Sequence, residues 1–150
     1  MRVIIQRVSE ASVTIDGKEK ARIKEGLLIL LGIEVADEKD DRDWLIRKVV
    51  NMRIFNDKDG VMNLSVNDIN GDVLIVSQFT LHASTKKGNR PSYMKAAPPV
   101  QAEEHYELFK KEMTEAIGKP IQCGEFGADM KVHLLNDGPV TIIIDSKNKE

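Results

Sequence analysis

The chain has 150 residues, of which 41% are hydrophobic and 31% charged, and its formal net charge is −2. This length favours one domain with its own core, and the charge excludes a protein that coats nucleic acid through its overall charge. No apolar run reaches the roughly 18 residues of a membrane-spanning helix, and the single cysteine, Cys123, excludes an internal disulfide. Because no signal-peptide pattern follows Met1, these features predict a cytoplasmic protein.

Strands dominate the first part of the chain. Residues 1–33 alternate apolar and polar side chains on both sides of Asp16-Gly17. An Asp-Gly pair between two such runs indicates a tight β-hairpin. We therefore expect three or four antiparallel strands in this region.

Two later segments have helical spacing. From residue 37 to about 52, Leu45, Val49 and Met52 fall on one face, and the acidic start suits the positive end of a helix dipole. A second helix is expected after Pro98-Pro99 and ends at Gly118, because proline suits a first turn and glycine a helix end. Its apolar face comprises Ala102, Tyr106, Phe109, Met113 and Ile117.

The remaining segments complete the predicted sheet. Residues 56–72 are rich in turn formers, 73–81 have the composition of a buried strand, and two further strands are expected at 130–135 and 140–145. Together the elements predict an α/β (α+β-like) single domain over residues 1–150, with a strand-rich, mostly antiparallel sheet or barrel covered by two helices. The charged tail, residues 146–150, is expected to fray.

Common catalytic motifs are missing from the sequence. It contains no glycine-rich phosphate loop, no HExxH or CxxC pair and no nucleophile elbow. The acidic residues of 56–72 lack the spacing of a calcium loop and favour turns instead. We therefore expect no metal site.

The stretch "SQFTL", residues 77–81, ends an apolar strand with polar side chains. On strand alternation, Ser77 and Phe79 face one side, and Gln78 and Thr80 face the other. Such residues often only cap a sheet. However, backbone N–H groups that leave a sheet edge can also hold an oxyanion, and Thr80 is a candidate nucleophile or positioning residue.

A basic segment follows at residues 82–95, which carry Lys86, Lys87, Arg90 and Lys95 and no acidic residue. One interpretation is a solvated loop. The functional interpretation is a landing site for phosphates, with Gly88 keeping the loop mobile.

A second unusual stretch is "NDGPVT", in which Gly138-Pro139 directly precedes an apparent strand. Proline donates no ladder hydrogen bond and glycine has no side chain to pack. The pair is therefore either a turn that begins the last strand or a functional backbone element.

The combination of "SQFTL" and "NDGPVT" with "QRV", "KKGNRPSY" and "FGADM" resembles the D-aminoacyl-tRNA deacylases, from Met1 to about Asp145. The resemblance implies hydrolysis of the ester that joins a D-amino acid, or glycine, to the terminal adenosine of tRNA. It also implies chirality proofreading by a homodimer, in which a cis Gly138-Pro139 pair enters the partner's pocket and excludes L-aminoacyl groups. It implies no cofactor.

Residue roles follow from the same resemblance. The implied catalytic residues around the ester are Ser77, Gln78, Phe79 and Thr80, of which Phe79 and Thr80 offer backbone N–H groups to the carbonyl oxygen. Arg7 is implied to fix the Gly138-Pro139 pair. Phe126 and Met130 would pack around the terminal adenine. Lys86, Lys87 and Arg90 would meet tRNA phosphates, an assignment that depends mainly on their charge.

The mechanism implied is attack by water, with the oxyanion held by backbone amides and assistance from the substrate's 2′-hydroxyl. A covalent Thr80 nucleophile is the alternative, but the sequence places no base beside it. Two other hypotheses stay open: a non-catalytic tRNA- or nucleotide-binding module, and a related deacylase with relaxed chirality and a trans Gly138-Pro139 bond.

Overall fold

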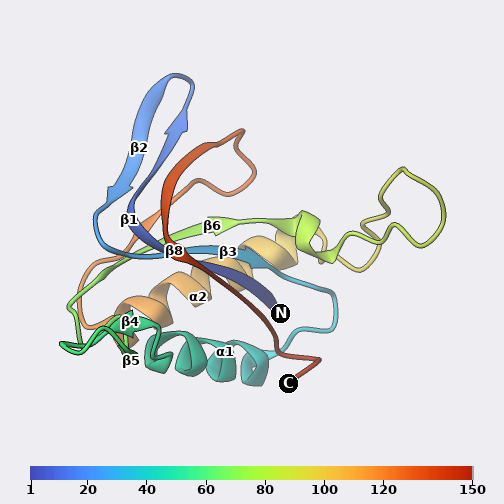
Figure 1. Ribbon diagram of the computed structural model, residues 1–150. Coiled ribbons are helices and arrows are strands. Elements are labelled where there is room, and N and C mark those ends of the chain that lie inside the picture. Colours follow the sequence, from blue (N-terminus) through green and yellow to red (C-terminus); the bar gives the residue numbers. More distant parts are fainter. Residues whose placement is uncertain (150) are drawn as a thin grey trace.

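The computed structural model describes residues 1–149 as a strand-rich sheet with two long helices on one side (Figure 1). The strands of the main sheet are β1 (Arg2–Ile15), β2 (Lys18–Ile23), β3 (Gly26–Gly32), β6 (Asp72–Ser77), β7 (Gln122–Cys123) and β8 (Lys131–Asp145). The helices are α1 (Lys39–Asn51), the 3-10 helix η1 (Phe79–His82) and α2 (Pro99–Ile117). A small separate pair comprises β4 (Phe55–Asn56) and β5 (Met62–Leu64).

The main sheet has the order β2-β1-β3-β6-β7, with β8 on the other side of β1. Strand β1 pairs antiparallel with β2, β3 and β8, and the predicted hairpin turn lies at Asp16 and Gly17, both of which have positive φ. In contrast, β3 and β6 are parallel, as are β6 and β7. The mixed, mostly antiparallel sheet agrees with the prediction.

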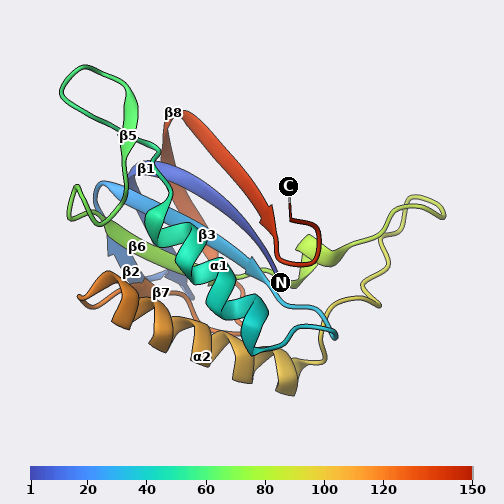
Figure 2. The same ribbon diagram turned by 90° about the horizontal axis from the view of Figure 1, so that it is seen from below.

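The helices cover one face of this sheet (Figure 2). Both predicted helices are confirmed, and Gly118 ends α2 with a φ of 76°. The main core between helices and sheet contains the fully buried Ile5, Ile29 and Leu45 and the side chains of Tyr106 and Phe109. Burial of such side chains contributes roughly 1.5–3 kcal/mol each.

The opposite face is covered only in part. A second cluster, which includes Val13, Ile23 and Leu28, forms where the β1–β2 hairpin folds over the sheet. Strand β8 pairs only with β1 and therefore forms an edge. On this strand Leu135 and Ile143 are 57% and 66% exposed, so apolar surface remains open along β8.

Two strand predictions are wrong in detail. The strand expected at 73–81 ends at Ser77, and Phe79–His82 form η1, so alternation does not describe residues 77–81. The ladder with β3 ends with the bond from Gln78 N–H to Leu31 O (2.8 Å), and beyond it the chain turns across Gly32, which leaves room for Leu81. The two strands expected at 130–135 and 140–145 are one strand, β8, whose pairing with β1 shifts around Val8.

Part of the tail that was expected to fray makes contacts with the body of the protein. Ser146 is buried and exchanges hydrogen bonds with Met1, Lys147 pairs with Asp41, and the Lys149 ammonium lies 4.8 Å from the Trp44 ring centroid. These partners lie more than 100 residues away along the chain, so no local pattern indicates them. The last position of the predicted tail, residue 150, lies outside the described residues.

Candidate active site

The candidate site lies at the end of the sheet that is formed by the carboxyl ends of three parallel strands. We call this end the carboxyl edge, to distinguish it from the edge strand β8. Strands β3, β6 and β7 run in the same direction, so the segments after Gly32, Ser77 and Cys123 leave the sheet at the same edge. Ligands of open sheets with parallel strands commonly bind outside these carboxyl ends. The "SQFTL" and "FGADM" segments follow two of the three strands.

Two backbone N–H groups at this edge have no acceptor among residues 1–149. Phe79 and Thr80 open η1, and the first N–H groups of a helix have no acceptor within it. Within residues 1–149 no other acceptor takes up these two groups. Paired N–H groups of this kind can stabilise the negative oxygen that develops during acyl transfer.

The position of η1 depends on Gly32, a residue that belongs to none of the sequence motifs. A Cβ atom at this position would lie 2.9 Å from the Cβ atom of Leu81 and 3.1 Å from the carbonyl oxygen of Gln78. Only glycine lets the segment after β6 pack so closely across the end of β3. Because such a close approach involves residues distant in sequence, the chain itself gave no signal for it.

The hydroxyl groups of the site have no basic partner. Thr80 Oγ1 accepts a hydrogen bond from Gln78 Nε2 at 2.5 Å. In the described part of the chain, no carboxylate or imidazole hydrogen bonds to Thr80 or Ser77. His82 lies two residues further on, but it is buried and its Nε2 has no hydrogen-bond partner among residues 1–149. A side-chain nucleophile would therefore lack the adjacent base that activation requires.

The "FGADM" segment brings an aromatic ring and a thioether to the same edge. The Phe126 ring centroid lies 5.7 Å from that of Tyr106, whose hydroxyl donates to Ile75 O (3.3 Å). Burial raises the pKa of Tyr106 well above its usual range, so this hydroxyl stays neutral. Phe126 and Met130 are both half-buried, which leaves part of each side chain open for a ligand.

Arg7 contacts the Gly138-Pro139 motif in the same chain. The Gly138-Pro139 peptide bond is cis, and both residues are exposed. Arg7 is buried; its Nε donates to Asp137 O (3.0 Å) and its Nη1 to Ile54 O (2.7 Å). A Cβ atom on Gly138 would lie 2.9 Å from Arg7 Nη2. The guanidinium therefore packs directly against the motif.

Within one chain, this motif lies far from residues 77–80. Arg7 pairs with Leu27 and Ser77 with Leu31, so the two motifs are four residues, or roughly 13 Å, apart along the strands. Three strand spacings separate β8 from β6, which adds roughly 14 Å across the sheet. Figures 1 and 2 show the bend of β8 well away from η1. A single chain does not place both motifs around one ester.

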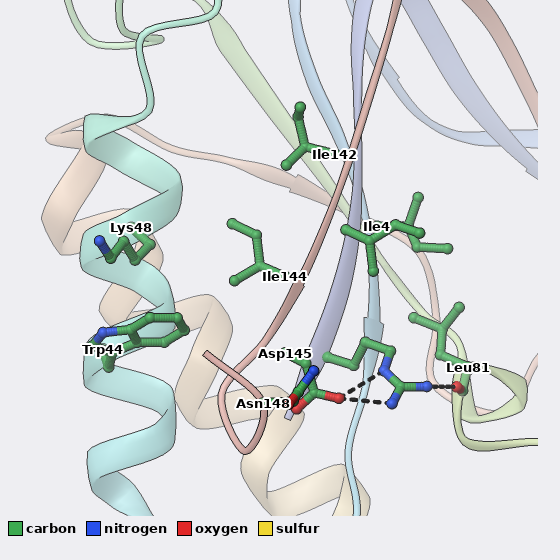
Figure 3. Close-up of a pocket in the computed structure, with 10 residues that line it drawn as sticks. Ile4, Trp44, Lys48, Leu81, Ile142, Ile144, Asp145 and Asn148 are labelled. Atoms are coloured by element: carbon green, nitrogen blue, oxygen red, sulfur yellow. Dashed lines mark hydrogen bonds and ion pairs between the residues drawn. The ribbon is translucent and has the colours of Figure 1, made fainter. Parts of the chain in front are cut away.

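A groove of about 610 Å³ lies between β8 and α1 and reaches Leu81 (Figure 3). At its edge Arg2 donates from Nη1 to Leu81 O (2.6 Å) and from Nε and Nη2 to Asp145 (2.9 and 2.7 Å). Arg2 thus joins the end of "SQFTL" to the end of β8, a link that no local sequence pattern indicates. Lining residues include Ile4, Trp44, Lys48 and Ile143, but none of Ser77–Thr80.

The basic loop projects from the body of the molecule, next to η1 (Figure 1). Lys86, Lys87 and Arg90 are all exposed. Among residues 1–149, no cluster of three or more histidine, cysteine or acidic side chains could hold a metal ion. No helix in the same range is long and apolar enough to cross a membrane.

The fold is a single mixed α/β domain, and the carboxyl ends of its parallel strands carry two backbone N–H groups that have no acceptor among residues 1–149. The family described as "D-Tyr-tRNA(Tyr) deacylase" matches residues 4–145. Proteins named D-aminoacyl-tRNA deacylase from Flavobacterium johnsoniae and Bacteroides fragilis are 64% and 63% identical over 150 residues, which cover 100% of each chain. The chain belongs to this family of hydrolases, which act on ester bonds.

Solved structures agree on the fold. A "c-Myc DNA Unwinding Element Binding Protein" is 40% identical with a TM-score of 0.93, and the match covers 97% of this chain and 98% of that one. A "probable eukaryotic D-amino acid tRNA deacylase" is 16% identical with a TM-score of 0.79, over 95% and 97% of the two chains. The second likeness supports the fold alone.

Proposed function

We propose that this protein hydrolyses the ester of D-aminoacyl-tRNA, and of glycyl-tRNA, to free amino acid and tRNA, and that it rejects L-aminoacyl-tRNA. The observation that carries the proposal is the pair of unused N–H groups on Phe79 and Thr80 at the carboxyl edge of the sheet. Membership of the deacylase family supports the substrate class. Such proofreading belongs in the cytoplasm, where aminoacyl-tRNA is used.

In the proposed reaction, water attacks the ester carbonyl and the N–H groups of Phe79 and Thr80 hold the oxyanion. Removal of one such donor typically costs 10²–10³-fold in rate. The hydrogen bond from Gln78 to Thr80 keeps the hydroxyl in place, and Ser77, the last residue of β6, lies beside the ester. No base contacts Thr80, so the substrate's own 2′-hydroxyl relays the proton: it accepts a proton from the attacking water and donates its own to the 3′-oxygen, which leaves as the ester C–O bond breaks. No cofactor takes part.

The terminal adenosine binds between Phe126 and Met130, which follow β7 at the same edge. An aromatic ring and a polarizable sulfur are suitable neighbours for a purine. The nearby cations Lys86, Lys87 and Arg90 contact phosphates of the tRNA.

Chirality is read by Gly138 and Pro139 of a second copy of the chain. The separation of roughly 20 Å between the two motifs in one chain supports action across a dimer. The exposed Leu135 and Ile143 on edge strand β8 offer apolar surface for that dimer. In it, the backbone carbonyls of the pair accept hydrogen bonds from the substrate's ammonium and leave no room for an L side chain.

The test compares hydrolysis of D-Tyr-tRNA and L-Tyr-tRNA by the purified protein. We expect rapid release of D-tyrosine and no acceleration with the L ester. Hydrolysis of neither ester would favour a binding module, and comparable hydrolysis of both would favour a deacylase with relaxed chirality. Sedimentation equilibrium of the same sample tests the dimer.

A further inference from the structure

A hairpin-like loop, residues 83–95, stands out from the body of the protein beside η1 (Figures 1 and 2). Its base is closed by reciprocal hydrogen bonds between Ser84 and Ser92, with N···O distances of 2.8 and 2.9 Å. On its return it is tied to the segment after β3, where Val35 N–H donates to Lys95 O (3.2 Å). The loop is therefore fixed at its base and open to solvent beyond it.

The charges of this loop are not neutralised by the protein. Its four cations are accompanied by no acidic residue between positions 83 and 95. None of the four belongs to an ion pair with any described residue, positions 1–149. An uncompensated cluster of this kind complements a polyanion. The four residues are Lys86, Lys87, Arg90 and Lys95.

The base of the loop also exposes large apolar side chains. Tyr93 packs edge-to-face on Phe79, with ring centroids 5.0 Å apart and an interplanar angle of 69°. Even so, Tyr93 is 39% and Phe79 56% exposed, and the neighbouring Met94 is 90% exposed. Solvated aromatic and thioether groups beside unpaired cations have the composition of a surface for single-stranded nucleic acid.

We propose that Tyr93, supported by Phe79 and Met94, stacks on the unpaired base next to the terminal adenosine of the substrate, while the loop's cations hold the adjoining phosphates. The proposal rests on the proposed function, since Phe79 is placed at the ester. The Tyr93 ring contacts the Phe79 ring directly. Its position next to the ester therefore suits the base of the neighbouring nucleotide in the same strand. Bases in a duplex are already stacked on each other, so the exposed ring fits the single-stranded 3′ end rather than the acceptor stem.

The test measures kcat/KM on three substrates of increasing length: D-tyrosyl-adenosine, the D-tyrosyl trinucleotide with the CCA sequence, and D-Tyr-tRNA. For the wild type, we expect a gain of about tenfold to a hundredfold from adenosine to trinucleotide, the range that one stacked base provides. Tyr93→Leu should lose most of that gain and leave D-tyrosyl-adenosine hydrolysis unchanged. Tyr93→Phe, which keeps the ring, should retain it.

A direct measurement can be made on the wild type, where its result does not depend on how a variant folds. A CCA trinucleotide with 2-aminopurine at the middle position should lose fluorescence on binding, because stacking quenches this base. The same probe should be quenched far less by Tyr93→Leu. Unchanged fluorescence with wild type at saturation overturns the proposal.

Other outcomes are equally decisive. If Tyr93→Leu lowers kcat/KM equally on all three substrates, the ring has a structural role. If it lowers kcat/KM on none of them, the loop binds another partner, such as a protein. Both results overturn the proposal. Failure of the proposed function has a different signature, since the wild type would then hydrolyse none of the three esters.

Discussion

The buried guanidinium of Arg7 donates from Nε to the carbonyl oxygen of Asp137, 3.0 Å away, and so fixes the residue that precedes Gly138-Pro139. A second hydrogen bond, from Nη1 to Ile54 O, fixes the guanidinium itself. Through Arg7, strand β1 thereby supports the bend of β8 at Gly138-Pro139. The orientation of an exposed backbone pair depends on a buried side chain 130 residues earlier.

Replacement of Arg7 by methionine should impair both stability and activity. The variant keeps a long apolar stem but leaves Ile54 O without its donor, at a cost of about 1–3 kcal/mol in the free energy of unfolding. Because the motif loses its support, kcat/KM for D-Tyr-tRNA should fall at least tenfold. Steady-state deacylation and urea unfolding measure the two effects. Arg22→Met, on the exposed hairpin, is the matched control and should change neither.

Substitution at Phe79 can separate the ring from the backbone donor. Phe79→Ala removes the ring but keeps the N–H group, whereas Phe79→Pro removes both. Proline is tolerated at the first position of a helix, and Gln78 before it, with φ −146° and ψ 78°, lies outside the α region that a following proline disfavours. We expect kcat of Phe79→Pro to lie about 10²–10³-fold below that of Phe79→Ala. Equal kcat values in two correctly folded variants would remove this N–H group from the mechanism.

A third substitution addresses the hydroxyl group. Thr80→Ala should retain most of the wild-type kcat, because the backbone N–H group remains and no base contacts the hydroxyl. Loss of a true nucleophile costs several orders of magnitude. Single-turnover hydrolysis of D-Tyr-tRNA makes the distinction, and a collapse to background would establish the covalent route instead.

A structural feature could be predicted from the sequence where it depends on residues close together in the chain, and was missed where it depends on distant residues. The hairpin at Asp16-Gly17 and helix α2 up to Gly118 follow from local rules and were found. The end of β6 at Ser77 was missed, because it depends on Gly32 leaving room for Leu81. Likewise, the packing of Ser146 against Met1 involves opposite ends of the chain.

The site was predictable as a set of motifs but not as an arrangement. The "SQFTL" and "FGADM" segments could be placed together only once β6 and β7 were known to be parallel. The distance of the Gly138-Pro139 pair from residues 77–80 was not visible in the sequence, since it depends on the pairing of β8 with β1. The aromatic contact between Phe79 and Tyr93 likewise joins residues whose spacing follows no local period.

The basic loop predicts a specific salt dependence. Changing Lys86, Lys87 and Arg90 together to glutamine should reduce the slope of log K against log salt for tRNA binding by about 2–3, since each lost phosphate contact contributes about 0.7–0.9. The ratio of D to L hydrolysis should stay the same, because phosphates carry no information on the amino acid. Binding measured between 50 and 200 mM salt tests this. An unaltered slope would leave the loop as an ordinary solvated surface.

The contact between Asp41 and Lys147 predicts a pH dependence of stability. Burial raises the pKa of Asp41, but hydrogen bonds from Lys147 (2.6 Å), the Glu38 N–H (2.9 Å) and Ser146 outweigh it and lower the pKa from 3.8 to about 2. Because the pKa of Asp41 is lower in the folded protein than in the unfolded chain, its carboxylate stabilises the fold at pH values above the unfolded-state pKa. This stabilisation is lost as the pH falls from about 4 to 2. With allowance for solvent screening, the contribution is on the order of 1 kcal/mol.

The comparison of wild type with Asp41→Asn isolates this group from the other carboxyls. The difference in the free energy of unfolding should be largest above pH 4 and should shrink towards pH 2. Urea unfolding at several pH values measures it. A difference that is constant over this range would show that Asp41 does not titrate as its contacts require.

The last prediction concerns the distance between Gly138 and the 77–80 segment in one chain. If the two motifs meet only across a dimer, two inactive variants should complement each other. Gly138→Ala disables one motif, because the φ of 127° strains an alanine and its Cβ atom would lie 2.8 Å from Val140 and 2.9 Å from Arg7. Phe79→Pro disables the other. Each homodimer should then be nearly inactive.

A mixed dimer of these variants carries one site with an intact Phe79 from one subunit and an intact Gly138 from the other. Random mixing in equal amounts makes about half of the dimers mixed, each with one working site, so activity should recover to roughly a quarter of wild type. Co-expression with two different affinity tags and sequential purification isolates the mixed dimer, whose activity should be about half that of wild type. A mixed dimer no more active than either parent would place Gly138-Pro139 outside the partner's site, and the separation within one chain would then require another explanation.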